Sequence, residues 1–439
     1  MRVLLVSTYE LGRQPFGLAS PAAWLRAEGH EVTLADLSRG PMPWAAVEQA
    51  ELIAFFLPMH TATRLFLRVV DRVRAANPRA HLCGYGLYAP LNADLLHRAG
   101  VRTVIGGEFE QPLSDLARRA AVPADSTSLA RQQFLVPDRS GLPPLSSYAQ
   151  LVVNGSTRPT GYTEASRGCK HLCRHCPVVP VYRGAFRVVQ PDVVLEDIRR
   201  QVAAGAGHIT FGDPDFFNGP AHALRIVEAL HGEWPDLTYD ATIKVEHLLR
   251  HRDLLPMLKE TGCLFVTSAV ESLDDAVLEK LAKGHTRAQF IEALSLMRAS
   301  GLPLSATFIP FTPWTTRESY REFLRALVDL DLAGEVAPIQ LAIRLLIPEG
   351  SLLLDLPEVR RIIQPFDPQG LCYPWRNPDP WLDSLCARIQ ETIKREEQRR
   401  TGRVEIFRRI WDLAQSGPFP DAPRPSRATI PYLTEPWYC

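Results

Sequence analysis

Three cysteines on one short loop are the residues in this chain best suited to chemistry. They lie in the stretch Cys169-Lys-His-Leu-Cys173-Arg-His-Cys176, with three residues in the first gap and two in the second. Three thiolates at this spacing can hold three irons of a 4Fe–4S cluster, whereas a ferredoxin cluster takes four cysteines. The fourth iron then has no protein ligand and is open to another molecule. The spacing therefore predicts a cluster that also serves as a binding site.

A zinc site is the alternative for the same loop. His171 or His175 could add a fourth ligand to the cysteines. Zinc ribbons usually place two ligand pairs on separate knuckles, and this sequence has no second pair. We therefore favour the cluster.

The loop lies within a Ser-Arg-Gly-Cys…Cys-Pro stretch, residues 166–177, that resembles the signature of the radical S-adenosylmethionine superfamily. The resemblance implies that S-adenosylmethionine binds the open iron through its amino and carboxylate groups. One electron from the cluster would then cleave the sulfonium and give a 5′-deoxyadenosyl radical, which is chemistry supplied by the cofactor. A reducing partner of the flavodoxin or ferredoxin type is implied as well.

Composition excludes several other classes. The 439 residues are 46% hydrophobic and 22% charged, with a formal net charge of zero, so neither nucleic acid nor an anionic membrane is an expected partner. No apolar run is long enough to span a bilayer. The eight cysteines do not resemble a secreted disulfide framework, and an oxygen-sensitive cluster needs a reducing compartment. We expect a cytoplasmic protein that acts on a small molecule.

The first 120 residues alternate apolar strands with helices. Continuous apolar runs at residues 3–6, 32–35, 52–57, 81–84 and 103–106 indicate a flavodoxin-like (Rossmann-like) parallel sheet covered on both faces. Ligands of such sheets bind at the carboxyl ends of the strands.

This part resembles the cobalamin-binding domain found ahead of many radical S-adenosylmethionine enzymes, on residues 17–32 and 105–110. The loop at residues 7–14 lacks the histidine of the cobalt-ligating Asp-x-His-x-x-Gly motif, so a domain that keeps the fold without the cofactor stays open. If cobalamin binds, the resemblance and the strand ends predict contacts at Ser7, Thr8, Tyr9, Met59, His60, Gly84, Tyr85, Gly106, Gly107 and Glu108.

A second alternation of strands and helices surrounds the cysteine loop. Expected strands at residues 161–164, 208–211, 237–243, 264–270, 304–309 and 339–346 fit a partial (β/α)6 barrel of the TIM type. Chemistry in such barrels occurs at the carboxyl ends of the strands. The predicted organisation is a cobalamin-binding-like domain at 1–120, a linker at 121–160, the barrel at 161–365 and a helical, proline-rich extension at 366–439.

Several polar residues follow these strands and are candidates to bind S-adenosylmethionine. Resemblance to the superfamily's Gly-Gly-Glu-like and ribose-contacting motifs suggests Gly212, Asp213, Pro214, Ser268 and Glu271. A position on one face of the sixth strand suggests Gln340 and Arg344. For Lys244 the alternative is a rim ion pair with Glu246, and for residues 212–215 a simple turn. The candidates are Gly212, Asp213, Pro214, Ser268, Glu271, Lys244, Gln340 and Arg344.

The last residues, 434–439, resemble the end of a radical S-adenosylmethionine family whose tail reads Cys-Sec-Ala-Glu-Pro or Cys-Cys-Ala-Glu-Pro. We hypothesise that the gene continues through an in-frame UGA read as selenocysteine. Cys439 would then be one half of a soft, nucleophilic pair. The alternative is an exposed thiol with no role.

These patterns predict a radical S-adenosylmethionine enzyme, a transferase rather than an oxidoreductase, with no catalytic residue assigned. If cobalamin binds, methyl transfer to an unreactive carbon or phosphorus is expected. One alternative is transfer of a 3-amino-3-carboxypropyl group to a soft acceptor such as arsenic. An alternative of another class is a non-catalytic iron–sulfur or zinc sensor.

Overall fold

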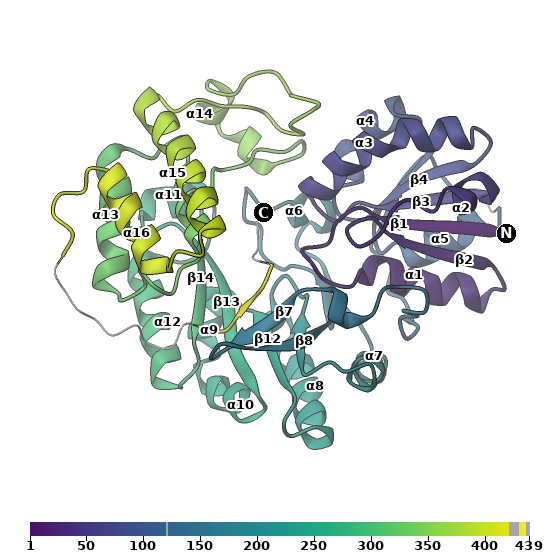
Figure 1. Ribbon diagram of the computed structural model, residues 1–439, viewed down its shortest axis with the longest axis horizontal. Helices are drawn as coiled ribbons and strands as arrows, with labels where there is room; N and C mark the ends of the chain where they lie inside the picture. The colour runs from purple at the N-terminus through teal and green to yellow at the C-terminus, as the bar shows by residue number, and fades with distance from the viewer. Residues whose placement is uncertain (120–121, 421–429, 436–439) are drawn as a thin grey trace.

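Two sheets, one parallel and one largely parallel, lie side by side in the computed structural model, which describes residues 1–119, 122–420 and 430–435 (Figure 1). The N-terminal sheet, purple to blue, is on the right of the view, and the larger sheet, teal to green, is on the left. Both sheets are flanked by helices. The α/β fold class predicted from the alternating pattern is confirmed.

The N-terminal sheet has the strand order β2-β1-β3-β4-β5-β6, and every neighbouring pair is parallel. Apolar side chains on both faces pack under helices, which explains why the strands read as continuous apolar runs. The order is that of flavodoxin-like folds with one further strand, and its reversal lies between β1 and β3. The strands are β1 (Arg2–Ser7), β2 (Glu31–Asp36), β3 (Leu52–Phe56), β4 (His81–Tyr85), β5 (Thr103–Gly107) and β6 (Asp125–Ser128); the helices are α1 (Phe16–Ala27), α2 (Trp44–Gln49), α3 (His60–Ala76), α4 (Ala93–Arg98) and α5 (Glu110–Ala117).

The larger sheet is a partial barrel with the order β14-β13-β12-β11-β8-β7-β15. Its first five strands in that order are mutually parallel, and β7 and β15 close the other edge as antiparallel strands. The strands are β7 (Gln150–Val153), β8 (Ser156–Thr163), β11 (His208–Phe211), β12 (Thr238–Thr242), β13 (Cys263–Glu271), β14 (Leu304–Phe308) and β15 (Tyr432–Leu433); the covering helices are α7 (Pro191–Ala203), α8 (Pro220–Glu233), α9 (Val245–Arg250), α10 (Leu255–Glu260), α11 (Asp275–Lys280), α12 (Arg287–Ala299) and α13 (Arg317–Asp329).

The prediction of a sixth barrel strand at residues 339–346 is wrong. Pro338–Leu341 form a 3-10 helix instead, and Pro338 suits its first position because the ring fixes φ near the helical value. The side chain of Gln340 replaces the missing strand at one point, where its Oε1 accepts a hydrogen bond of 2.9 Å from the Phe308 N–H. A single parallel bridge between Phe311 and Arg344 is what remains of the expected pairing.

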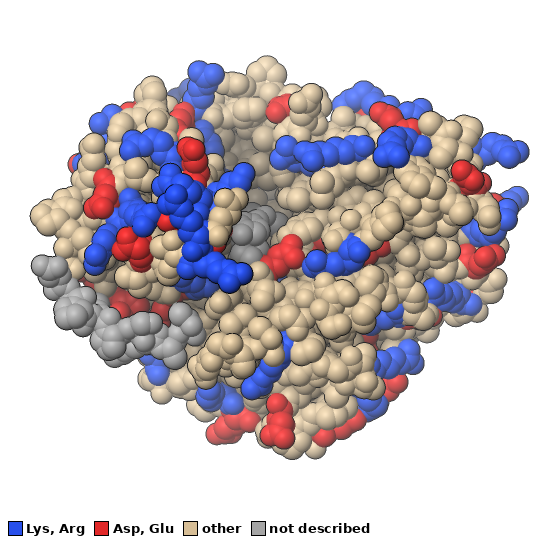
Figure 2. Space-filling view, viewed as in Figure 1, with Lys and Arg blue, Asp and Glu red and all other residues tan. Residues whose placement is uncertain are grey.

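The C-terminal region is helical and packs on the barrel. Helices α15 (Pro380–Gln398) and α16 (Arg403–Leu413) bury apolar side chains in the same core as the barrel helices. In Figure 1 they lie beside α13, and the short α14 (Pro357–Arg360) lies above them. Figure 2 shows the surface hollowed between α15 and the N-terminal unit, with lysine and arginine side chains gathered over α15 and α16.

Within the parts of the chain that the structure describes, no helix has the length and apolar character needed to cross a bilayer. Cys439, the candidate nucleophile of the tail, lies outside the described residues.

Candidate active site

The cysteine loop connects a small hairpin to a short helix at the carboxyl ends of the barrel strands. It runs from β9 (Ser166–Gly168), which pairs antiparallel with β10 (Phe186–Val188), to α6 (Val178–Tyr182). Gly168 starts the loop with a φ of +73°, and a Cβ there would lie 2.4 Å from the Tyr182 ring. Only glycine accepts both the left-handed backbone and this close approach.

The three thiols of the loop fit a cluster by their chemistry. All three are free, with Cys173 buried and Cys169 and Cys176 half-buried. Burial raises the pKa of Cys169 and raises that of Cys176 to about 12, so these thiols ionise readily only when a metal takes the thiolate. Three soft donors within eight residues are therefore poised for iron or zinc.

The first half of the loop is tied to the barrel by Asp215, which follows β11 and is fully buried. Its Oδ2 lies 3.2 Å from His171 Nε2 of the loop and 2.7 Å from His247 Nδ1 of α9. Burial acts to raise the pKa of Asp215, but the bonds with His171 and His247 outweigh it and lower the pKa. Ligand atoms of Cys169, His171 and Asp215 lie within 4.8 Å of one another, so the zinc alternative has a geometric basis on His171.

The second half of the loop is tied to β13 through Glu271. Glu271 Oε1 lies 3.0 Å from His175 Nε2 and 3.4 Å from Lys283 Nζ, and all three groups are largely removed from solvent. Burial acts to raise the pKa of Glu271, but the Lys283 ammonium and the His175 bond overcome it and lower the pKa to about 2. Glu271 also has a φ of +69° at a bulge in the pairing of β13 with β14. Backbone strain at a non-glycine residue is typical of functional sites.

The same half of the loop docks on the C-terminal end of α11. The Arg174 N–H donates to the Leu281 carbonyl at 2.9 Å, and its guanidinium donates to the carbonyls of Glu279 and Lys280 at 3.1 and 2.9 Å. A cation at this end of a helix satisfies unpaired carbonyls and complements the helix dipole. Ser351 completes the contact by donating its hydroxyl to the Arg174 carbonyl at 3.0 Å.

Of the residues predicted to contact S-adenosylmethionine, Lys244 and Glu271 contact this loop. Lys244 Nζ lies 3.8 Å from Cys173 Sγ and 3.9 Å from Glu246 Oε2, and Lys244 is buried. Ser268 is completely buried on β13, and its hydroxyl has no hydrogen-bond partner among the described residues. An unpaired buried hydroxyl is a group that a ligand could satisfy.

Asp213 and Gly212 hold the approach to the loop in place. The Asp213 carboxylate accepts from the Ser166 hydroxyl at 2.5 Å and from the Ala165 N–H at 2.9 Å, just upstream of the cysteines. Burial raises the pKa of Asp213 to about 7. Gly212 is required because a Cβ there would lie 1.9 Å from the Tyr162 hydroxyl oxygen. Pro214 then joins this clamp to Asp215, and a direct contact of residues 212–214 with S-adenosylmethionine stays a prediction.

Gln340 and Arg344 are not on one strand face, so the geometry that suggested them is wrong, and their contact with S-adenosylmethionine stays a prediction. The side chain of Gln340 bonds to the backbone of β14, as described above. Arg344 donates to Asp383 Oδ1 at 2.6 Å and to the Trp375 carbonyl at 2.6 Å, and it lies 3.6 Å from the centre of the Trp375 ring. Arg344 therefore fastens the C-terminal region to the barrel.

The carboxyl end of the N-terminal sheet carries unsatisfied polar groups. The Ser7 hydroxyl, at the end of β1, and Glu10 Oε2 are buried with no hydrogen-bond partner among the described residues. Desolvation, reinforced by Glu164, raises the pKa of Glu10 well above its ordinary value. Thr8 donates to the Ala62 carbonyl at 2.8 Å, and Tyr9 between them is half-buried.

Three more pairs of residues were predicted to contact cobalamin, and the structure places them differently. Met59 and His60 begin α3, and His60 Nε2 lies 2.6 Å from the Gly370 carbonyl of the C-terminal region. Gly107 ends β5 with a φ of +70° and, like Gly106, has backbone or side-chain atoms where a Cβ would be. Gly84 and Tyr85 do not form the expected loop. They are the last two residues of β4, and the Tyr85 side chain is buried in the core with its hydroxyl on the Gly17 carbonyl.

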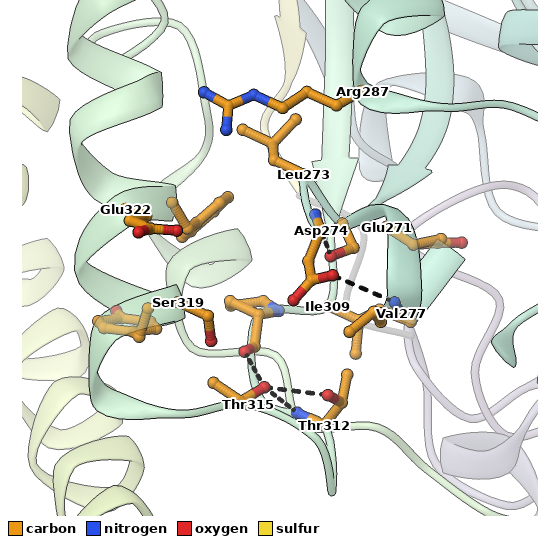
Figure 3. A pocket seen from close by; sticks show the side chains of 14 residues that line it. Glu271, Leu273, Asp274, Val277, Arg287, Ile309, Thr312, Thr315, Ser319 and Glu322 are labelled. Atoms are coloured by element: carbon orange, nitrogen blue, oxygen red, sulfur yellow. Dashed lines mark hydrogen bonds between the residues drawn. The ribbon is translucent and has the colours of Figure 1, made fainter. Parts of the chain in front are cut away.

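A cavity of about 280 Å³ opens on the outer side of the β13 and β14 ends (Figure 3). In Figure 3 the Glu271 side chain points away from the other lining side chains, as its bonds to His175 and Lys283 require. Thr312 and Thr315 bond to each other across one wall. Glu271 thus lines this cavity, but its carboxylate is bonded to His175 and Lys283 on the side of the cysteine loop.

Comparison with known proteins identifies the central part of the chain. The family model of the Radical SAM superfamily matches residues 163–327, which include the cysteine loop and all strands from β11 to β14. For this segment, the match agrees with the superfamily predicted from the cysteine spacing. The likeness to the family with a selenocysteine tail stays a prediction.

Two curated relatives carry transferase names. The chain is 25% identical to the hopanoid C-3 methylase of Methylococcus capsulatus over 343 residues, which cover 71% of this chain and 64% of the relative. It is 25% identical to the ribosomal protein uS12 methylthiotransferase RimO of Parabacteroides distasonis over 187 residues, 39% of this chain and 42% of the relative. The chain thus spans less than two thirds of either protein.

Solved structures share the fold over both sheets. OxsB, a cobalamin-dependent S-adenosylmethionine radical enzyme solved with aqua-cobalamin and S-adenosylmethionine bound, matches with a TM-score of 0.69 and 15% identity over 89% of this chain and 66% of its own. TsrM from Kitasatospora setae, a radical S-adenosylmethionine methyltransferase solved with cobalamin and a 4Fe–4S cluster, matches with a TM-score of 0.57 and 17% identity over 76% and 71%. These comparisons give no support to aminocarboxypropyl transfer or to a non-catalytic sensor.

Proposed function

We propose that this chain, whose residues 163–327 form a radical SAM domain, is a cobalamin-dependent methyltransferase that takes its methyl group from S-adenosylmethionine and acts on a small molecule. One observation carries the proposal. A flavodoxin-like sheet with unpaired polar groups at its carboxyl end is fastened to a barrel with a three-cysteine loop. The methylase and methyltransferase names among the similar proteins support the same reaction class.

The loop residues Cys169, Cys173 and Cys176 would hold the cluster. When bound, the cluster and S-adenosylmethionine supply one-electron cleavage of the sulfonium, and cobalamin supplies a carrier for the methyl group. The protein's part is to orient these groups. Asp215 and Glu271 fix the two halves of the loop through His171 and His175, and Lys244 places a buried cation beside Cys173.

Cobalamin would bind at the carboxyl end of the N-terminal sheet. Among the residues that the structure describes, the buried Ser7 hydroxyl and Glu10 Oε2 have no hydrogen-bond partner, and a ligand with amide side chains could satisfy them. Gly106 and Gly107 keep side chains away from the end of β5. No residue among Ser7–Gln14 is a histidine, so the protein would bind the cofactor without a histidine ligand from this loop.

The proposal needs two partners that stay proposals themselves, a small-molecule substrate and a one-electron donor of the flavodoxin or ferredoxin type. A reductant is required because each cleavage of S-adenosylmethionine consumes one electron that the chain cannot supply.

The test is an anaerobic reconstitution with iron, sulfide and hydroxocobalamin, followed by reduction, addition of methyl-deuterated S-adenosylmethionine and mass spectrometry. We expect S-adenosylhomocysteine, formed only when cobalamin is present, together with 5′-deoxyadenosine from the one-electron cleavage, and label on the cobalamin. 5′-Deoxyadenosine alone, independent of cobalamin, would replace methyl transfer by hydrogen abstraction. 5′-Methylthioadenosine would replace it by aminocarboxypropyl transfer. One zinc per chain after reconstitution, with no iron, would overturn the cluster assignment.

A further inference from the structure

Arg167 lies between the two predicted cofactor sites. It is the middle residue of β9, two positions before Cys169, and its side chain is buried. The sequence pattern had offered it only as part of the Ser-Arg-Gly-Cys stretch. Its contacts, however, reach across to the N-terminal sheet.

The guanidinium of Arg167 binds three carboxylates. Nη1 and Nη2 donate to the two oxygens of Glu110 at 3.0 and 2.7 Å, and Nε donates to Glu164 at 2.7 Å. Nη1 also lies 3.4 Å from Glu108 Oε2. The paired bonds to Glu110 are the bidentate geometry that an arginine forms and a lysine cannot. The rings of Phe109 and Phe134, 4.7 and 5.0 Å from the guanidinium carbon, fix its plane.

Two of these carboxylates belong to the edge where cobalamin is expected. Glu108 follows β5 directly, and Glu110 is the first residue of α5. The other oxygen of Glu108 accepts from the Tyr182 hydroxyl at 3.1 Å, and Tyr182 ends α6, the helix that follows the cysteine loop. The loop is therefore bonded to one end of the N-terminal sheet from both of its sides.

We infer that Arg167 is a positioning residue that makes the binding of cobalamin and the binding of the iron–sulfur cluster favour each other. The inference rests on the proposed function and deepens it. A ligand that fixes the Gly106–Glu110 segment fixes the partners of Arg167 and Tyr182, and these flank the three cysteines. A cluster that fixes the cysteine loop orders the Glu108 and Glu110 side chains in the same way.

The reason is electrostatic. A buried guanidinium and buried carboxylates are stable only while they stay paired, because a shift of either partner leaves an uncompensated charge in a poorly solvated place. The segments that carry them must therefore move together or not at all. Coupling between two binding sites is reciprocal, so each cofactor should raise the affinity for the other by the same factor.

The experiment measures the dissociation constant of hydroxocobalamin by its absorbance change, for full-length protein with and without a reconstituted cluster. We expect the cluster-loaded wild type to bind hydroxocobalamin about 5-fold or more tightly than the cluster-free protein, the lower end of typical coupling between sites. Arg167→Lys, which keeps the charge but loses the paired bonds, should bring this ratio close to 1.

Two further variants separate coupling from folding. Tyr182→Phe removes one hydroxyl and no charge, so it should fold and lower the ratio in part. Arg199→Lys is the control, because Arg199 also forms paired bonds to one carboxylate, Glu233 at 2.8 Å, but joins α7 to α8 and does not contact Glu108 or Glu110. It should keep the wild-type ratio. A wild-type ratio in both Arg167→Lys and Tyr182→Phe would overturn the inference.

The outcomes also distinguish the inference from the proposed function. If hydroxocobalamin binds neither form of the wild type, the proposed function fails and the inference fails with it. If hydroxocobalamin binds both forms equally well, the proposed function stands and the coupling is refuted. The reciprocal readout is iron retention against a chelator, which hydroxocobalamin should improve in the wild type and not in Arg167→Lys.

Discussion

The carboxyl ends of the two sheets differ in how their buried polar groups are paired. At the barrel, the charged groups near the cysteines are paired with one another across loops, as with Asp215 and His171 or Glu271 and Lys283. At the N-terminal sheet, Ser7 and Glu10 keep buried oxygens without partners among the described residues. The charged groups of the first edge are therefore paired by the protein itself, while the Ser268 hydroxyl there has no partner among the described residues. The second edge is one that a ligand would complete.

The largest expected effect is the loss of the cluster from the paired edge. Cys173→Ala should lower iron from about 4 to under about 1 per chain after reconstitution, since three thiolates are needed to hold the cluster. Iron and sulfide analysis with the absorbance spectrum measures this. Cys372→Ala is the control, because Cys372 is a free, half-buried thiol outside the loop, opposite Asp367 in the C-terminal region, and its loss should leave iron unchanged. Full iron content in Cys173→Ala would place the cluster elsewhere.

The next effect is on stability at the paired edge. Glu271→Gln removes the carboxylate that faces Lys283 and His175, and breaking one side of a buried pair costs about 3–5 kcal/mol. The melting temperature of the cluster-free variant at pH 7 should therefore fall by several degrees.

The stabilising contribution of Glu271 should depend on pH. Its pKa is about 2 in the folded protein against an ordinary value of 4.5, so its stabilising contribution is present above pH 4.5 and is lost as the pH falls toward 2. The difference in melting temperature between wild type and Glu271→Gln should shrink below pH 4.5. A constant difference would show that Glu271 is not ionised in its pair.

A smaller effect of opposite sign is expected at Asp213. Burial raises its pKa to about 7 from 3.8, so the folded state holds a proton that the unfolded state has released, and stability falls as the pH rises between these values. The slope is at most about 1.4 kcal/mol for each pH unit. Melting curves from pH 5 to 8 should show a weaker pH dependence in Asp213→Asn than in wild type. Equal slopes would contradict the assignment.

The smallest effect tests the unpaired edge directly. Ser7→Ala removes a buried hydroxyl without a partner, so the cofactor-free protein should be unchanged or more stable by about 1 kcal/mol. Its affinity for hydroxocobalamin should fall several-fold if that hydroxyl meets the ligand. Ser20→Ala is the contrast, because its hydroxyl donates to Glu110 at 2.6 Å and its loss should destabilise the protein. If Ser7→Ala destabilises as much as Ser20→Ala, the two edges do not differ as argued.

The fold was largely predictable because its strands are continuous apolar runs. Five barrel strands and the first five strands of the N-terminal sheet fall within a few residues of the runs read from the sequence. The exception, at residues 339–346, is largely apolar as well, but the chain there begins with a 3-10 helix and Gln340 supplies a side-chain bond to β14 in place of the ladder. A local pattern cannot show that a side chain will replace a strand.

The site was predictable where chemistry is written in local spacing and not where it depends on distant pairs. The three cysteines needed only their own spacing. Lys283 lies just before Thr286, the residue that caps α12. Its bond to Glu271 and the docking of Arg174 on α11 were missed. These contacts join loops that meet only because the barrel brings the strand ends together. The local sequence offered little sign of them beyond the Lys283-Gly284 pair itself.

The antiparallel edge of the barrel sheet has a consequence for how this chain behaves when cut. The strand β15 is two residues long, yet it pairs with β7, whose Leu151 is buried beside Ile430. Without it, the apolar strand β7 would present an unpaired ladder to other molecules, which is a template for aggregation. A protease that cuts just before residue 430 would remove β15. The protein should then precipitate, even though the cut would leave in place every cofactor contact discussed above.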